Sequence, residues 1–382
     1  MVSLFFILLF INACHGDLLH VITIWRHGDR TPSGTFPNDP NQKDAWPQGW
    51  GELTTTGMDQ LYRQGLKLKQ RYIDDLKFLN ASYRSEEAYF RSSDYDRAIS
   101  SAYSNIAGFY SGSRGTYPSG NGWPKPYSPV PVHTVPKDID HLLNLFRNCP
   151  RQKELIRERT SEPEYVEFLS RYEDYFSTVT SLSGGSPIKD ILQLASFLDV
   201  LAIERLRNMT LAPWITGKII RQGEQILEET RDYVFGLDGF GKGEQVELLM
   251  LNGGALLKDV VESFENVIRG RHQPKYVGYS THDGNILALL RVLGARKKIT
   301  GKKNVDYGVV VALELWGFGG KHFIRLQYSA NAETPFKTVT RAVSGCPGSA
   351  FCPLETFIKQ GKKYLLENPE KACRALKRPD IP

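Results

Sequence analysis

The stretch VITIWRHGDRTPSGTFP, residues 21–37, joins a strand-like run to a polar loop that carries two arginines and a histidine. LLHVITIW, residues 18–25, is almost wholly apolar and rich in β-branched side chains, which is typical of a central strand covered on both faces. Open α/β folds bind ligands at the carboxyl ends of such strands. Arg26, His27 and Arg30 are therefore candidate ligand-binding residues.

Two guanidinium groups beside an imidazole favour a bound anion. Each guanidinium group attracts a unit negative charge 4 Å away by about 4 kcal/mol if the effective dielectric constant is about 20. The forked donors of arginine also match the geometry of phosphate oxygens. A structural interpretation stands beside this one. In it, Arg30 pairs with Asp29 or another carboxylate, and His27 is a buried histidine with satisfied hydrogen bonds.

The chain around this stretch alternates strand, loop and helix patterns, which predicts an α/β fold with parallel crossovers. Apolar spacing predicts a helix over 55–73 and short strands at 88–93 and at the start of 275–294. DYDRAISSAYSNIAGFY predicts a helix that begins with a carboxylate cap. VDYGVVVALELWGFGGKHFIRLQYSA predicts two strands joined by the turn GFGG.

Residues 111–136 are dense in glycine and proline and predict a loop. From 138 to about 270 the apolar period is helical, as in IKDILQLASFLDVLAIERL. We therefore expect an α/β domain built from 17–135 and 271–382, with a mainly helical domain inserted at 136–270.

The first residues, MVSLFFILLFINACHG, predict a secretory signal peptide over 1–16, cleaved near Gly16. The alternative is an uncleaved membrane anchor. Asn80 and Asn208 each begin a glycosylation acceptor tripeptide, which agrees with export.

Loss of Cys14 with the signal leaves four cysteines, which is enough for two disulfides with three possible connectivities. GCPGSAFCP is a short, turn-rich loop, so we favour Cys346 with Cys352 and therefore Cys149 with Cys373. The spacings match no zinc-ligand pattern.

The net charge of +6 is mild for 382 residues, and no block of five or six like charges occurs. Basic residues alternate with acidic ones, as in KQRYIDDLK. This composition argues against a nucleic-acid-binding protein.

RHGDRTP resembles the RHGxRxP signature of the histidine phosphatase superfamily, in its histidine acid phosphatase branch and nearest to the animal prostatic and lysosomal group. ELTTTGMDQLYRQGLKLKQRY, RSSDYDRAISSA, LNGGALLKDV and STHDGN resemble further segments of that branch, so the resemblance covers nearly the whole chain. It implies a three-layer αβα sandwich like that of phosphoglycerate mutase, with a mostly parallel central sheet and a smaller inserted helical domain.

The resemblance also implies roles for six residues. His27 is the expected nucleophile and Asp283 the expected proton donor to the leaving group. The expected ligands of the substrate phosphate are Arg26, Arg30, Arg97 and His282. No metal or other cofactor is expected.

Structural alternatives exist for the distal residues as well. His282 and Asp283 could serve only to cap a helix that starts near Asn285, and Arg97 could be an exposed helical arginine beside acidic neighbours. With RHGDRTP upstream we favour the catalytic interpretation. The chain departs from some relatives in having four mature cysteines rather than six and HD rather than HAE.

The resulting expectation is a secreted acid phosphatase acting on small phosphomonoesters, with phosphopeptides and phospholipids as further substrate classes. A lysosomal location and a homodimer are compatible with the same resemblance. Two alternatives remain open: a secreted protein that binds phosphorylated ligands without turnover, and a phosphatase restricted to inositol phosphates or lysophosphatidate.

Overall fold

Strand β1, Asp17–Arg26, lies in the middle of a seven-stranded sheet. Its neighbours are β3, Tyr276–Thr281, which runs parallel to it, and β4, Val310–Phe318, which runs antiparallel. Residues Val21, Ile22 and Ile24 are fully buried, because both faces of the sheet are covered. The prediction of a central, doubly covered strand is confirmed.

The computed structural model describes residues 16–124, 127–185 and 187–374. Apart from Gly16, the expected signal peptide lies outside the described residues. Within the described residues, no helix combines the length and the apolar character needed to cross a membrane.

The sheet is mixed, with the strand order β2-β3-β1-β4-β5-β6 and with β7 paired to β5. β2, β3 and β1 are parallel to one another, whereas β4 and β5 form the predicted antiparallel hairpin. The other strands are β2 (Ala88–Ser92), β5 (Lys321–Ser329), β6 (Lys337–Thr338) and β7 (Cys352–Pro353).

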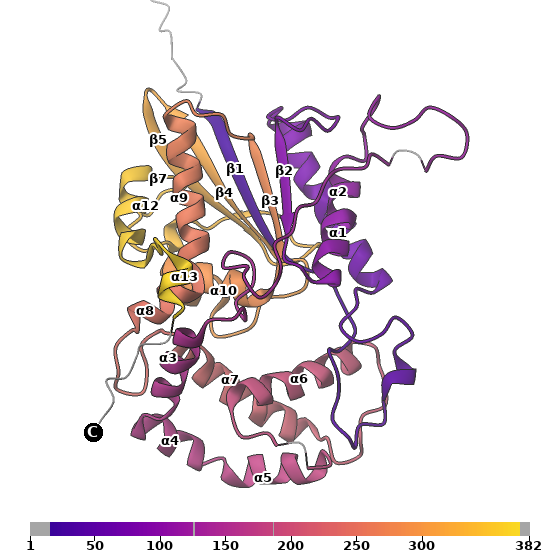
Figure 1. The fold of residues 1–382 in the computed structure, drawn as a ribbon, viewed down its shortest axis with the longest axis vertical. Coiled ribbons are helices and arrows are strands. Elements are labelled where there is room, and N and C mark those ends of the chain that lie inside the picture. The colour runs from indigo at the N-terminus through magenta and orange to yellow at the C-terminus, as the bar shows by residue number, and fades with distance from the viewer. Residues whose placement is uncertain (1–15, 125–126, 186, 375–382) are drawn as a thin grey trace, which may run out of the picture.

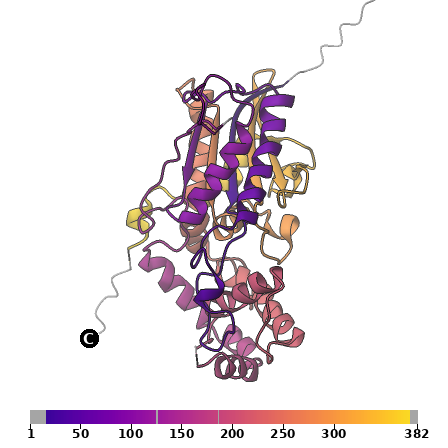
Figure 2. The same ribbon diagram turned by 90° about the vertical axis from the view of Figure 1, so that its right-hand side faces the viewer.

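Helices cover both faces of the sheet, which confirms the expected three-layer αβα sandwich (Figures 1 and 2). On one face, α1 (Thr55–Lys69) and α2 (Asp96–Phe109) pack with Trp25 of β1 in one hydrophobic cluster. On the other face, α9 (Ala255–Ile268) and α10 (Asp283–Val292) pack with Ile24 in a second cluster.

The two helices of the first face approach each other closely because of a glycine. A Cβ atom on Gly65 of α1 would lie 2.0 Å from the carbonyl oxygen of Asn105 in α2. Helix α1 begins at the predicted place, where the side chain of Thr54 accepts a hydrogen bond from the backbone N–H of Gly57.

The expected carboxylate cap of α2 is wrong. The residue that precedes the helix is Tyr95, and its side chain makes no capping hydrogen bond. Its ring lies instead 4.9 Å, between centroids, from the ring of His282. The tertiary contact has overridden the local capping preference.

Between the two segments of the chain that form the α/β layers, a group of helices has its own hydrophobic cluster, which includes Tyr165, Leu194, Leu201 and Ile226. Figure 1 shows these helices below the sheet. They are α3 (Pro150–Thr160), α4 (Pro163–Ser170), α5 (Glu173–Leu182), α6 (Ile191–Leu206) and α7 (Gly217–Val234).

Helix α9 lies just before residue 270, where the helical insertion was expected to end. Its buried residues Val260 and Phe264 belong to the cluster on the sheet, not to the helical cluster. We therefore propose that the helical insertion ends before α8, Val246–Leu249, while the other expected boundaries stay predictions.

The remaining elements are short. The 3₁₀ helices are η1 (Lys43–Ala45), η4 (Thr340–Ala342) and η5 (Lys362–Tyr364), and the π-helical turns are η2 (Gln70–Asp75) and η3 (Met250–Gly254). The other α-helices are α11 (Arg296–Thr300), α12 (Leu354–Gly361) and α13 (Pro369–Ala372).

Two disulfides have the favoured connectivity. One joins Cys149, before α3, to Cys373, after α13. The other joins Cys346 to Cys352 within a short loop.

Candidate active site

The signature motif RHG and the distal motif HD lie together at the carboxyl ends of β1 and β3. The backbone N–H of His27 donates to the carbonyl oxygen of Thr281, at 2.9 Å, so RHG and HD follow neighbouring strands at the same edge. Gly28 is needed here, because a Cβ atom at that position would lie 2.4 Å from the carbonyl oxygen of Gly57. The glycine allows the start of α1 to press against the loop.

The imidazole of His27 is buried and neutral. Its Nδ1 lies 2.8 Å from the carbonyl oxygen of Gly28, which can only accept, so Nδ1 carries the proton. Burial, followed by the charges of Arg26, His282, Arg30 and Arg97, lowers the pKa of His27 well below its usual value of 6.5. The lone pair of Nε2 is therefore available.

Arg26 is the last residue of β1 and is 6% exposed. Its Nη1 donates to the carbonyl oxygen of Val305 at 2.6 Å, and its Nη2 lies 3.4 Å from Oδ2 of Asp283. The guanidinium carbon lies 4.2 Å from the centroid of the Tyr307 ring. These contacts fix the guanidinium group beside His27.

Arg30 pairs with a carboxylate that the sequence did not indicate. Its Nη2 donates to both oxygens of Asp199 in α6, at 3.1 and 3.0 Å. The structural interpretation had Arg30 pair with Asp29 or another carboxylate, and the partner is another carboxylate, because Asp29 forms its ion pair with Arg207 at 2.5 Å. Burial opposes the charge of Arg30, but Asp199 outweighs it and raises the pKa of Arg30.

Arg97 enters from the first turn of α2, and its guanidinium carbon lies 4.8 Å from the centroid of the Tyr95 ring. Among the described residues it has no ion pair with the acidic neighbours expected in the structural alternative. Burial and the charge of Arg30 lower the pKa of Arg97 to about 10. With this pKa the guanidinium group stays protonated in neutral and acidic solution.

Each of the three arginines has a buried donor without a partner. The Nε atoms of Arg26, Arg30 and Arg97 make no hydrogen bond within the described part of the chain. Buried donors are almost always paired in native structures. Because these three cations surround the same imidazole, their unpaired donors fit a site for an anion with several oxygens.

His282 and Asp283 stand at the start of α10. The ring of His282 lies 5.4 Å, between centroids, from that of His27, and its Nε2 lies 2.9 Å from Oγ of Ser93. Burial, followed by the charge of Arg97, lowers the pKa of His282 to about 3, so this imidazole is neutral.

The carboxyl group of Asp283 is surrounded by donors and cations. Its Oδ2 accepts a hydrogen bond from Nδ2 of Asn304 at 2.8 Å, and its Oδ1 accepts from the N–H of Gly284 at 2.8 Å. Burial alone would raise the pKa of Asp283. Arg26, the bond from Asn304 and the charge of Arg231 outweigh burial and hold that pKa below its usual value.

The structure thus brings together all six residues predicted to form the site. Besides Tyr95, sequence reasoning missed Ser93, Asp199, Asn304 and Tyr307, which all contact these residues. Ser93 lies inside the quoted segment RSSDYDR, and a pattern search there could have found it. No local signal marks the other three, because their contacts depend on tertiary folding.

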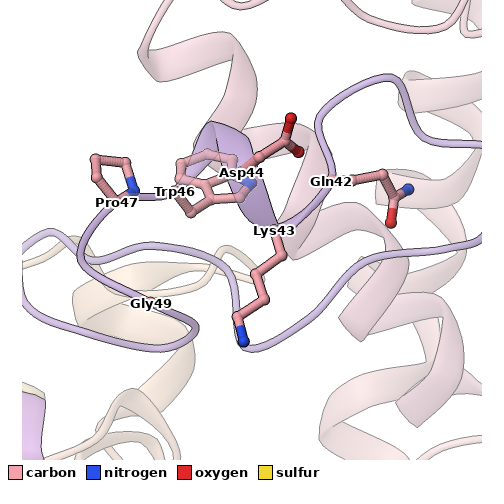
Figure 3. A pocket seen from close by; sticks show the side chains of 6 residues that line it. All are labelled: Gln42, Lys43, Asp44, Trp46, Pro47 and Gly49. Carbon is pink, nitrogen blue, oxygen red and sulfur yellow. The ribbon is translucent and has the colours of Figure 1, made fainter.

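The surface depression in Figure 3 lies outside this group of residues. It has a volume of about 620 Å³ and is lined by Gln42, Lys43, Asp44, Trp46, Pro47 and Gly49, around η1. One hydrogen bond connects its lining to the signature segment: the hydroxyl group of Thr31 donates to the carbonyl oxygen of Gly49 at 2.7 Å.

The described residues contain no group of three or more histidine, cysteine, aspartate or glutamate side chains that could hold a metal ion. The six predicted residues instead combine a neutral imidazole, a second imidazole, three guanidinium groups and one carboxyl group. Such a set can bind an oxyanion, attack it and exchange a proton with it.

Comparisons with known proteins agree with this geometry. Prostatic acid phosphatase from Bos taurus is 33% identical over 348 residues, covering 90% of this chain and 84% of the relative. Lysosomal acid phosphatase from Rattus norvegicus is 31% identical over 362 residues, covering 94% and 80%.

Among solved structures, the phytase from Klebsiella sp. ASR1 superposes with a TM-score of 0.63 at 16% identity, covering 93% of this chain and 97% of that one, which shows the shared fold. The family model described as histidine phosphatase superfamily (branch 2) matches residues 17–329. With this span and relatives above 30% identity, the chain belongs to the histidine phosphatase superfamily, branch 2.

Proposed function

We propose that this chain is a secreted, metal-independent acid phosphatase that hydrolyses small phosphomonoesters through a phosphohistidine at His27. One observation carries the proposal. A buried, neutral imidazole with its proton on Nδ1 lies among three arginines whose Nε donors lack partners among the described residues. A phosphoryl group supplies the missing acceptors and the electrophile.

In the first step, Nε2 of His27 attacks phosphorus and the bond from phosphorus to the ester oxygen breaks. Arg26, Arg30 and Arg97 hold the non-bridging oxygens, and His282 is placed to donate or accept one further hydrogen bond. The fixed guanidinium groups stabilise the charge on these oxygens as the phosphoryl group moves.

Asp283 gives its proton to the departing ester oxygen, so an alcohol leaves and Asp283 becomes a carboxylate. In the second step a water molecule attacks phosphorus on the phosphohistidine and loses a proton to Asp283. The bond from phosphorus to nitrogen breaks, inorganic phosphate leaves, and both His27 and Asp283 return to their starting states.

The low pKa of Asp283 in the free site conflicts with a role as proton donor. Two effects resolve the conflict. A phosphate dianion occupies Arg26 and offsets the charges that lower this pKa. A phosphomonoester also has its second pKa near about 6, so below that pH the substrate itself brings a proton into the site. The second effect favours an acidic working pH.

Secretion, glycosylation at Asn80 and Asn208, and association into a homodimer are parts of the same proposal. Asn208 is exposed and follows α6, and Asn80 is half-buried in the loop before β2. Mass spectrometry of protein from the culture medium, before and after enzymatic deglycosylation, tests cleavage near Gly16 and both glycans. Equilibrium sedimentation of that protein tests the dimer.

The deciding experiment is turnover of p-nitrophenyl phosphate by the purified mature protein at about pH 5. Turnover supports the phosphatase and eliminates the non-catalytic binding protein. Absence of turnover, with tight binding of inorganic phosphate, overturns the proposal. A panel of phosphopeptide, lysophosphatidate and inositol phosphate substrates then distinguishes broad from narrow specificity.

A further inference from the structure

Helix α6 of the helical insertion contacts the signature segment through a carboxylate. Nη2 of Arg30 donates to both oxygens of Asp199, at 3.1 and 3.0 Å. Nη1 of the same guanidinium group donates to the carbonyl oxygen of Thr31 at 3.1 Å. Acceptors on two different nitrogens fix the plane of a guanidinium group, so Arg30 has a defined orientation before any ligand binds.

These contacts leave part of the guanidinium group of Arg30 unused. Its Nε is buried and has no hydrogen-bond partner in the part of the chain that the structure describes. Arg30 as a whole is only 9% exposed, whereas the side chain of Asp199 is 31% exposed. Asp199 thus takes Nη2 while Nε stays open to a phosphate oxygen.

Helix α6 is itself fixed against the signature segment on both sides of Asp199. Before it, the ring of Phe197 lies 5.4 Å, between centroids, from that of Phe36 in the loop after the signature. After it, at the end of the helix, Arg207 forms an ion pair with Asp29 at 2.5 Å. The position of the Asp199 carboxylate is therefore set by the packing of the helix as well as by its own ion pair.

Asp199 also reduces the net positive charge around the phosphate site. A carboxylate 3.0 Å from Nη2 of Arg30 offsets part of the attraction of that cation for an anion. This offset acts alike on bound substrate and on bound inorganic phosphate. The orientation of the guanidinium group matters most in the transition state, because its donors must then follow the moving oxygens. Loss of Asp199 should therefore slow the reaction without weakening the binding of phosphate.

We propose that Asp199 is a positioning residue of the active site, which holds Arg30 in the orientation in which its remaining donors meet the phosphoryl oxygens. The helical insertion thereby completes the site that the α/β layers begin. This inference rests on the proposed phosphatase activity and deepens it. Asp199 acts through Arg30 and not on the phosphoryl group itself.

The test compares Asp199→Asn with wild-type protein on p-nitrophenyl phosphate, with inorganic phosphate as a competitive inhibitor. The variant keeps the size of the side chain but loses its charge and one of its two acceptors. We expect kcat to fall about tenfold, the value of one charge-assisted hydrogen bond, and the inhibition constant of phosphate to rise less than about twofold. An unchanged kcat, or an inhibition constant that rises as much as kcat falls, overturns the inference.

A double-mutant cycle shows whether Asp199 acts through Arg30. In Arg30→Ala protein, the further change Asp199→Asn is expected to lower kcat less than about twofold, because no guanidinium group remains to be held. A further loss of about tenfold shows an independent role and overturns the inference. If Arg30→Ala protein has no measurable turnover, the kcat and the inhibition constant of the single variant decide.

Asp174→Asn is the matched control, since Asp174 is exposed on α5 of the same insertion and the change in charge is the same. It is expected to leave kcat and the inhibition constant unchanged. Thermal unfolding midpoints check the fold, and a lower midpoint in Asp199→Asn together with weaker phosphate binding overturns the inference in favour of a structural role. If wild-type protein turns over no phosphomonoester, the proposed function fails instead.

Discussion

The Nδ1 atom of His27 lies 2.8 Å from the carbonyl oxygen of Gly28, the residue that follows it in the chain. This contact decides the tautomer, because a carbonyl oxygen accepts a hydrogen bond and cannot donate one. It leaves Nε2 as the only nitrogen of the ring that can attack phosphorus. The backbone turn after β1 therefore selects the reacting atom.

Quenched turnover is expected to trap phosphate on Nε2 of His27 and not on Nδ1. ³¹P NMR of the denatured, base-stable phosphoprotein distinguishes the two isomers, and His27→Ala is expected to abolish both the signal and turnover. The thermal unfolding midpoint of the variant serves as the control for folding. Retained turnover by the variant, or phosphate on another residue, contradicts the assignment.

Asp283→Asn is expected to slow alkyl phosphates more than aryl phosphates with good leaving groups, because only a poor leaving group needs the proton. We expect the ratio of the two losses in kcat to be about tenfold or more, within the usual range for general acid catalysis. Steady-state kinetics with p-nitrophenyl phosphate and an alkyl phosphate measure it. Equal losses on both substrates would argue against protonation of the leaving group by Asp283.

The motif residues could be predicted because each stands directly beside a local pattern. Arg26 and His27 end an apolar strand, and Asp283 follows another, so parallel pairing of β1 with β3 places them at one edge. Asp199 shows the limit of this reasoning. It lies on α6 amid an apolar repeat, and its pairing with Arg30 spans 169 positions of the chain.

Tyr95 illustrates a second limit. The acidic residues beside it predict a capped helix, yet the ring of Tyr95 packs against His282 and lies under the guanidinium group of Arg97. The contacts of the site compete with the cap and prevail, and no local propensity encodes them. The packing of α9 is a similar case, since a helix has the same apolar period whether it packs on helices or on a sheet.

Chelation is expected to leave the activity unchanged, because the charges on the phosphate are balanced by guanidinium groups. Assays of dialysed protein in EDTA, with a zinc-dependent phosphatase as the positive control for chelation, measure this. A loss of activity that returns on addition of a divalent metal would contradict a metal-independent mechanism.

A buried carboxyl pair joins the loop after the signature motif to α6. Glu204 is fully buried, and burial, followed by a hydrogen bond with Asp39, raises its pKa to about 8, although Nδ2 of Asn41 donates to its Oε1 at 3.0 Å. Thr35 donates to the same Asp39. The nearby cation Arg207 is bound to Asp29 and does not neutralise the pair. The carboxyl group of Glu204 therefore keeps its proton to a higher pH than an ordinary glutamate.

This pair predicts a loss of stability in mildly alkaline solution. The pKa of Glu204 is higher in the folded chain than its ordinary value of 4.5, so the folded state binds the proton more tightly. The resulting stabilisation is complete below about pH 4.5 and is lost as the pH rises through about 8, with a slope of at most about 1.4 kcal/mol per pH unit.

Glu204→Gln keeps a hydrogen-bond donor at this buried position but removes the group that titrates. Its free energy of unfolding, from urea titrations at about pH 5 and about pH 8, is therefore expected to fall less with pH than that of wild-type protein. Glu224→Gln, at an exposed position on α7, is expected to follow wild-type protein. If the free energy of unfolding of the Glu204 variant falls as steeply with pH as that of the other two proteins, the proton on Glu204 does not stabilise the folded chain.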